Sequence, residues 1–231
     1  MTSPTLSIIS SMATQNLLVD LVSLYEKQHP GLSIKVESVG GQVAAKRVEA
    51  GEAFDGVVLA ADVIDRLAGT GRIVKGSRVD LVRSGVAVAV RSGASRPDLS
   101  NGDAIKQAVL DAPTVGYSTG PSGVQLALLF ERWGIAEAIK SKLVVAPPGV
   151  PVGSLVARGD VSLGFQQMSE LMHLEGIDVV GPLPDDIQIT TIFSGGLAAT
   201  SGQPEAMRQL FGFLASADAA QAKKNNGMDP A

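Results

Sequence analysis

The strongest constraint on this 231-residue chain is its alternation between short apolar segments and segments of helical period. The pattern begins with Leu6 to Ser10, a β-branched segment typical of a strand. Apolar residues then recur at helical spacing from Leu17 to Tyr25, and this predicts a helix. His29, Pro30 and Gly31 end the helix, and we expect His29 to form its C-terminal cap.

The same strand-loop-helix rhythm continues along the chain, and no internal repeat by identity accompanies it. Asp62 is expected to be the N-cap of one helix, 63–68. Further strands are expected at 32–38, 56–60, 82–93, 114–116, 143–146 and 161–165, with extended segments at 179–180 and 187–198. Further helices are expected at 43–50, 102–110, 124–133, 152–158, 204–214 and 217–225. Another is expected after Gln167 and ends at about residue 173. Successive strand-helix units predict an α/β fold with mainly parallel sheets.

Composition excludes several classes of protein. Hydrophobic residues make up 45% of the chain, which is enough for one large domain or two small lobes with their own cores. The net charge is −4 and no stretch gathers lysine and arginine, so nucleic acid is not expected as a partner. The apolar runs are far shorter than the roughly 20 residues that span a bilayer, so we expect a soluble protein without membrane insertion.

Chemistry that depends on a cofactor or a metal is not indicated either. The chain has no cysteine and only two histidines, His29 and His173, which lack metal-ligand spacing, so no metal is expected. It has no GxSxG, GxxxxGK[ST] or GxGxxG motif, and no cofactor is expected. The N-terminus lacks a secretory signal pattern. We therefore expect a periplasmic protein if a signal peptide was removed, and a cytoplasmic one otherwise.

Loops of small, hydroxyl or amide residues connect many of the predicted strands to helices. In the first half these are 10–15 (SSMATQ), 38–42 (SVGGQ) and 60–62 (AAD). In the second half they are 118–123 (STGPSG), 147–154 (PPGVPVGS) and 165–169 (FQQMS). The carboxyl-end loops of parallel strands converge on one crevice, and helix N-termini there bind anions through unpaired N–H groups. The sequence therefore predicts an anion site, between the lobes if the two sets of loops face each other.

Lys46 and Arg47 lie one turn into the helix that Gly41 and Gln42 open. They form either a solvated pair on the helix face or, if one reaches the crevice, a charge-assisted contact with a carboxylate ligand.

An ordered set of segments also resembles bacterial periplasmic molybdate-binding receptors over nearly the whole chain. The segments are SSMATQ, VESVGGQVAAKRVEAGEAFDGVVLAADVIDRL, GYSTGPSGVQLALLFERWGI, VGPLPDDIQ and the terminal NGMDPA. The resemblance implies a type II periplasmic-binding fold with two α/β lobes joined by crossing strands at a hinge. We expect 1–83 plus 190–231 in the first lobe and 84–189 in the second, with the ligand cleft between them.

The resemblance also implies which positions bind the ligand. In the first lobe they are Ser10 or Ser11 and Ser38 with Gly40 and Gly41. The loops themselves add Gln42 and Ala61, with Lys46 and Arg47 as possible cations. In the second lobe they are Ser118, Thr119, Gly120, Ser122, Gly123 and Val152, with Gln166 and Gln167 where the family has a tyrosine. Amide side chains suit a multiply hydrogen-bonded organic acid better than a tetrahedral oxyanion.

Three functions remain open. The first is a solute-binding protein that clamps a small anion, an organic carboxylate before molybdate, and delivers it to an ABC-transporter permease. The second is an isomerase of an unsaturated tricarboxylate, because the same superfamily includes aconitate isomerase. Its base would come from Glu37, Asp62 or Tyr117 and would shift an allylic proton. The third is an intracellular ligand sensor, which would require a partner protein.

Overall fold

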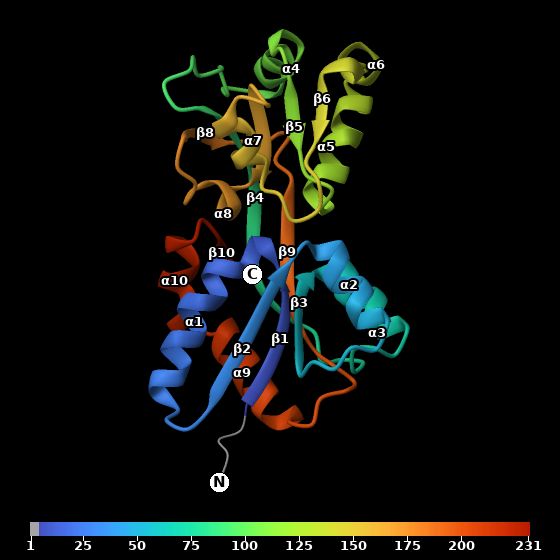
Figure 1. Cartoon of the computed structure of the whole chain (residues 1–231), viewed down its shortest axis with the longest axis vertical. Coiled ribbons are helices and arrows are strands. Elements are labelled where there is room, and N and C mark those ends of the chain that lie inside the picture. The colour runs from blue at the N-terminus through green and yellow to red at the C-terminus, as the bar shows by residue number, and fades with distance from the viewer. Residues whose placement is uncertain (1–4) are drawn as a thin grey trace. The chain divides into compact units, whose positions relative to one another are not determined.

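The computed structural model describes residues 5–231 and confirms the expected α/β class (Figure 1). The strands are β1 (Thr5–Ser11), β2 (Ser33–Val39), β3 (Gly56–Ala60), β4 (Val79–Arg91), β5 (Val115–Tyr117), β6 (Leu143–Val145), β7 (Leu163–Gln167), β8 (Ile177–Pro182), β9 (Thr190–Leu197) and β10 (Asp229–Pro230). The α-helices are α1 (Gln15–Gln28), α2 (Gly41–Glu49), α3 (Ala61–Gly69), α4 (Gly102–Asp111), α5 (Pro121–Arg132), α6 (Ala136–Ile139), α7 (Val152–Arg158), α8 (Met168–Leu171), α9 (Pro204–Ala215) and α10 (Ala220–Asn225). Short 3-10 helices are η1 (Met12–Thr14), η2 (Lys140–Lys142) and η3 (Ala217–Ala219).

The described residues form two compact units. Unit 1 contains the described chain up to Arg83 and the segment Ile192–Ala231, and unit 2 is Ser84–Thr191. The chain therefore passes between the units twice, once within β4 and once within β9. Each unit has its own set of paired strands and its own hydrophobic clusters. Across residues 5–231, no helix combines the length and the apolar character needed to cross a membrane.

Unit 1 is built on a sheet with the strand order β2-β1-β3-β9. Strand β1 runs parallel to both β2 and β3, whereas β9 is antiparallel to β3. Successive side chains of a strand point to opposite faces, and the core clusters follow this alternation. Ile8 and Val58 belong to one cluster, and their neighbours Ile9 and Val57 belong to the other. Helices thus cover both faces of the sheet, as expected for parallel strands.

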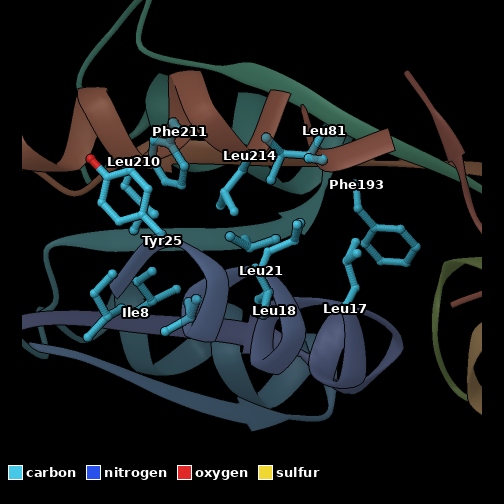
Figure 2. Packing of buried hydrophobic residues seen from close by; sticks show 14 of the residues in the cluster. Ile8, Leu17, Leu18, Leu21, Tyr25, Leu81, Phe193, Leu210, Phe211 and Leu214 are labelled. Carbon is cyan, nitrogen blue, oxygen red and sulfur yellow. The ribbon is translucent and has the colours of Figure 1, made fainter. Parts of the chain in front are cut away.

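Helices α1 and α9 bury the larger of these two faces. Figure 2 shows Leu21 and Tyr25 of α1 facing the side chains of Leu210 and Leu214 from α9, and all four residues are buried in one cluster. The apolar positions of α1 recur at spacings of three and four, which places them on a single side of the helix. On the opposite face of the sheet, α2 and α3 contribute buried alanine, valine, isoleucine and leucine side chains.

Unit 2 repeats this layered arrangement with the strand order β4-β7-β5-β6, and β8 pairs with β4. The short strand β5 is parallel to both β6 and β7. Val88 of β4 packs in the cluster beneath α4 and α5, and the next residue, Ala89, packs in the cluster beneath α7. The small side chain suits the α7 face, where Gly164 of β7 also lies close to Val156.

Most of the predicted elements are confirmed. The C-terminal cap at His29 is confirmed as well, because His29 is the C-cap residue of α1 and its backbone N–H donates to the carbonyls of Tyr25 and Glu26. Its ring also stacks on Tyr25, with the ring centres 3.9 Å apart. Two expectations were wrong. Asp62 is not the N-cap of α3, because the helix already begins at Ala61 and Ala60 is the N-cap residue. The strand expected at 161–165 continues through Gln167, so the two glutamines lie in β7 and not in a loop.

Four small elements were not predicted, namely α6, η1, η2 and β10. Helix α6 and the 3-10 helices are each one turn long, which is too short to produce a periodic pattern in sequence. The two-residue strand β10 pairs with Val82 and Arg83 of β4, so the end of the chain is held by unit 1.

Lys223 in α10 is an unusual component of the core of unit 1. Its side chain is only 1% exposed, and its Nζ atom has no hydrogen-bond partner among the described residues. Burial lowers the pKa of this amine below its ordinary value. An unpaired amine in an apolar environment lowers stability, because the charged form loses its hydration without gaining a partner.

We therefore expect Lys223→Met to raise the free energy of unfolding by about 1–3 kcal/mol, the cost of an unpaired buried polar group. Urea unfolding at pH 7 measures this difference. Lys224→Met is the matched control, because its side chain is exposed and the change should shift stability by less than about 0.5 kcal/mol. A destabilised Lys223→Met variant would show that the amine has a stabilising partner.

Candidate functional site

The carboxyl ends of β1, β2 and β3 form one edge of unit 1. In the parallel register of β1 with β2, Ser10 lies opposite Ser38, and their hydroxyl oxygens are 2.7 Å apart. Ser10 is fully buried, whereas Ser38 is partly exposed. The structure therefore brings two of the predicted ligand residues together, with a buried hydroxyl orienting an accessible one.

Helices α2 and α3 begin at the same edge, and neither has a side-chain cap from its N-cap residue. Gly40 is the N-cap residue of α2, and Gly41 is its first residue. A Cβ atom on Gly41 would lie 3.7 Å from Ser11 Oγ, so the first two loops approach each other closely. Ser11 Oγ itself accepts a hydrogen bond from Ala13 N at 3.3 Å and begins η1. Ala61 is the first residue of α3 and is partly exposed.

Arg47 is held by acidic groups of unit 1. Its guanidinium bonds Glu37 Oε1 at 2.5 Å and Glu52 Oε2 at 2.7 Å, and it lies 5.5 Å from the centre of the Phe54 ring. The hydrogen bond from Arg47 lowers the pKa of the Glu37 carboxyl. A carboxylate stabilised in this way is a weaker base, so the structure weakens the case for Glu37 as a proton acceptor. Lys46, in the preceding position, is exposed.

Asp62 lies in the first turn of α3 and is exposed, and Gln42 in the first turn of α2 is exposed as well. An acidic residue in the first turn of a helix interacts favourably with the helix dipole. This gives Asp62 a structural role without burial.

In unit 2, β5 and β7 are parallel neighbours and end at a common edge. The loop after β5 contains Ser118, whose Oγ accepts a hydrogen bond from Gly120 N at 3.3 Å, and α5 begins at Pro121. A Cβ atom on Gly123 would lie 1.8 Å from the Ser118 carbonyl oxygen, so only glycine permits this approach. Ser122 and Gly123 are buried in the first turn of α5, and Thr119 is partly exposed. The predicted loop is therefore a compact turn at the beginning of a helix.

Tyr117 ends β5 and has a packing role. Its ring meets Phe130 edge-on with the ring centres 6.4 Å apart, and its carbonyl oxygen accepts a hydrogen bond from Ala146 N at 2.9 Å.

Gln166 of β7 bonds both the beginning of α7 and helix α8. Its Oε1 accepts a hydrogen bond from Val152 N at 2.7 Å, and its Nε2 donates to Glu170 Oε1 at 2.8 Å. Gln166 is 3% exposed. Two residues that we predicted as separate ligand contacts, Gln166 and Val152, are thus bonded to each other.

Gln167 points to the other face of β7 and is also buried. Its amide bonds the hydroxyl of Thr191 at 2.9 Å. With the amide oxygen accepting this bond, its nitrogen donates to Ser84 Oγ at 2.9 Å and to the Gly85 carbonyl at 3.2 Å. The Gln167 side chain therefore connects β7 with β4 and β9 inside unit 2, at residues next to the points where the chain leaves this unit.

Glu170 is a functional candidate that sequence reasoning missed. Burial raises the pKa of its carboxyl to about 7, against the opposing effect of the hydrogen bond from Gln166. Its spacing of four residues from Gln166 could have indicated the pair, although the two residues lie on a strand and a helix. A carboxyl that titrates near neutrality can exchange a proton under physiological conditions.

Within residues 5–231, no group of three or more histidine, cysteine, aspartate or glutamate side chains could hold a metal ion.

Comparison with solved structures identifies the fold class of the protein. The chain is similar to the periplasmic molybdate-binding protein of Azotobacter vinelandii, with a TM-score of 0.79 at 16% identity, covering 96% of this chain and 98% of the other. It is also similar to the sulfate-binding protein SubI of Mycobacterium tuberculosis, with a TM-score of 0.78 at 15% identity, covering 98% and 87%. The fold is therefore that of a type II periplasmic binding protein, as the sequence indicated.

The family follows from sequence. Residues 6–229 match the model of the bacterial extracellular solute-binding protein family. An aconitate isomerase from Pseudomonas sp is 40% identical over 232 residues, covering 98% of this chain and 88% of that protein. The chain belongs to the bacterial extracellular solute-binding protein family.

The ionisation of Glu170 should be visible in stability. Its pKa rises from 4.5 to about 7 on folding, so the folded state favours the protonated carboxyl. The stabilisation is complete below pH 4.5 and is lost as the pH rises toward 7. Between pH 4.5 and 7.5, wild type should lose about 3 kcal/mol of unfolding free energy relative to Glu170→Gln, at about 1.4 kcal/mol for each pKa unit.

Urea titrations of both proteins across this pH range measure the difference. Glu175→Gln is the control, because it removes the same charge from an exposed side chain and should follow the wild-type profile. Parallel profiles for wild type and Glu170→Gln would show that Glu170 has an ordinary pKa.

Proposed function

We propose that this protein binds a small organic anion carrying carboxylate groups, with candidate ligand residues in unit 1 and in unit 2. The observation that carries the proposal is the Ser10–Ser38 hydroxyl pair, at an edge where α2 and α3 also begin. Such an edge supplies hydroxyl donors and the positive ends of two helices. The cation Arg47 is already bonded to Glu37 and Glu52, so it does not offer an unpaired charge to an anion.

In this proposal the ligand groups of unit 1 come from the loops at Ser10–Ser11, Ser38–Gln42 and Ala61. Those of unit 2 come from the loop 118–123, the backbone N–H of Val152 and the amide of Gln166. The hydrogen bond from Val152 N to Gln166 Oε1 supports this set, because it places the two groups next to each other. A ligand carboxylate could replace the amide oxygen as the acceptor for Val152.

The preference for an organic carboxylate over a tetrahedral oxyanion is supported by the relative at 40% identity, which is an aconitate isomerase. The molybdate- and sulfate-binding neighbours, at 15–16% identity, support the fold alone. As a solute-binding protein, the chain would deliver its ligand to an ABC-transporter permease from the periplasm. Membership of the extracellular solute-binding family supports this partner and this compartment.

The second candidate function is isomerisation of the bound anion, and the same 40% identical relative favours it. In such a reaction a base removes a proton from the methylene carbon of an unsaturated tricarboxylate. A proton then returns to the former alkene carbon as the double bond shifts. The substrate neither gains nor loses electrons, so the reaction consumes no co-reactant. Asp62 and Tyr117 remain candidates for the base, whereas Glu37 is disfavoured by its bond to Arg47.

A thermal-shift screen against cis-aconitate, trans-aconitate, citrate, molybdate and sulfate tests both functions. A ligand that binds only the folded state raises the melting temperature with its concentration. We expect stabilisation by the tricarboxylates, and proton NMR of the mixture over time then separates the two functions. Interconversion of the aconitate isomers would establish the enzyme, and unchanged spectra would establish the receptor. Stabilisation by molybdate alone would contradict the carboxylate preference.

Removing one hydroxyl from each unit tests the site. Ser38→Ala and Ser118→Ala should each weaken binding of the best tricarboxylate by at least about tenfold, because a hydrogen bond to a charged group is worth about 1.5–3 kcal/mol. Isothermal titration calorimetry measures both affinities. Ser23→Ala is the control, because Ser23 is exposed on α1 and should leave the affinity unchanged. If only one of the two variants binds more weakly, the ligand contacts one unit and not both.

A further inference from the structure

The carboxyl of Glu170 is one side chain away from the proposed ligand contact of unit 2. Gln166 bonds Val152 N with its oxygen at 2.7 Å and Glu170 with its nitrogen at 2.8 Å. The two bonds fix the orientation of the amide, because its oxygen can only accept and its nitrogen can only donate. An anion that takes the hydrogen bond of Val152 N must therefore displace Gln166 Oε1, and one amide group then separates its position from the Glu170 carboxyl.

The surroundings of this carboxyl contain little that could neutralise it. Helix α8 packs against β7 and α7. Strand β7 has no ionisable residue, and the cation of α7, Arg158, is bonded to Asp160 at 3.0 Å. The other ionisable groups nearby in sequence are the exposed His173 and Glu175, and Asp178, which is bonded to Ser92 and Arg96. Among the described residues, no charge–charge interaction contributes to the pKa of Glu170, and burial dominates it.

We propose that Glu170 takes up a proton when the ligand anion binds, so that the affinity for the anion depends on the ionisation of this single carboxyl. This inference rests on the proposed function, since it requires an anion at Val152 and Gln166. A carboxylate close to an incoming anion is repelled by it, and this repulsion raises the pKa of the carboxyl. Protonation removes the repulsion and leaves the carbonyl oxygen of Glu170 free to accept the bond from Gln166.

The direction of the pH dependence follows from linkage. The Glu170 carboxyl of the free protein titrates near pH 7, and a neighbouring anion raises its pKa further. Below pH 7 the group is protonated with or without ligand, so the affinity is constant. Above pH 7 binding must be accompanied by proton uptake, and the affinity falls by up to about tenfold for each pH unit until the pKa of the complex is reached.

Calorimetric titration of trans-aconitate between pH 6 and 9 tests this inference. Wild type should bind about tenfold more weakly at pH 8.5 than at pH 6.5. Glu170→Gln should keep the high affinity throughout, because a glutamine at this position has the shape of the acid and accepts the same bond from Gln166. Glu175→Gln should retain the wild-type pH dependence, which controls for the loss of one negative charge and for titration of the ligand itself.

A second measurement needs no variant of Glu170. Titrations of wild type at pH 8 in two buffers of different ionisation enthalpy give the number of protons taken up, which should exceed half a proton for each ligand bound. Tight binding with no proton uptake and with equal pH profiles in wild type and Glu170→Gln would overturn the inference and leave the proposed function standing. The absence of tricarboxylate binding in wild type would overturn both.

Discussion

The parallel pairing of β1 with β2 and β3 is the constraint on which the candidate site of unit 1 depends. This register places Ser10 opposite Ser38, and it brings the beginnings of α2 and α3 to the same edge. Asp55 reinforces the register below that edge, because its carboxylate accepts hydrogen bonds from Ser7 N at 2.9 Å and from Ser201 Oγ at 2.8 Å. The position of the polar edge therefore follows from how the buried apolar strands pair, and the hydroxyl groups need little flexibility to meet a ligand.

In unit 2, the polar residues of the edge satisfy one another. The side chains of Gln166 and Gln167 are both buried, and each bonds neighbours on its own side of β7. A buried amide without partners would lower stability, so these bonds are needed whenever the ligand is absent. Under the proposed function, binding at Val152 is an exchange in which the ligand gains one backbone donor and releases one amide oxygen. The affinity then depends on the difference between two similar hydrogen bonds, and a nearby charge such as that of Glu170 can alter this difference.

The sequence predicted most of the fold because its strong signals are local. Apolar periodicity located the long helices α1 and α9, and a five-residue apolar run located β3 with its observed bounds. The failures have physical causes. Asp62 has the chemistry of an N-cap but lies inside α3, since the backbone turns into the helix already at Ala61. The end of β7 was misplaced because glutamine has no strong strand preference, and pairing of Gln166 and Gln167 with β4 extends the strand.

Residue type and position indicated candidate residues at the strand ends, but not the bonds that these residues form. Residue type and position indicated Ser10 and Ser38, and strand register then determined their contact. The partners of Arg47 could not be predicted in the same way, because Glu37 and Glu52 reach it from a strand and from the loop that follows α2. Glu170 was missed for a related reason: its unusual pKa arises from burial by β7 and α7, which sequence spacing does not report. Both sets of contacts determine the charge that an anion would encounter. In unit 1, Glu37 and Glu52 neutralise Arg47, and in unit 2 the ionisable carboxyl of Glu170 is bonded to Gln166, a predicted ligand residue. Under the proposed function, selectivity then depends on the pattern of hydrogen-bond donors and on the protonation of Glu170.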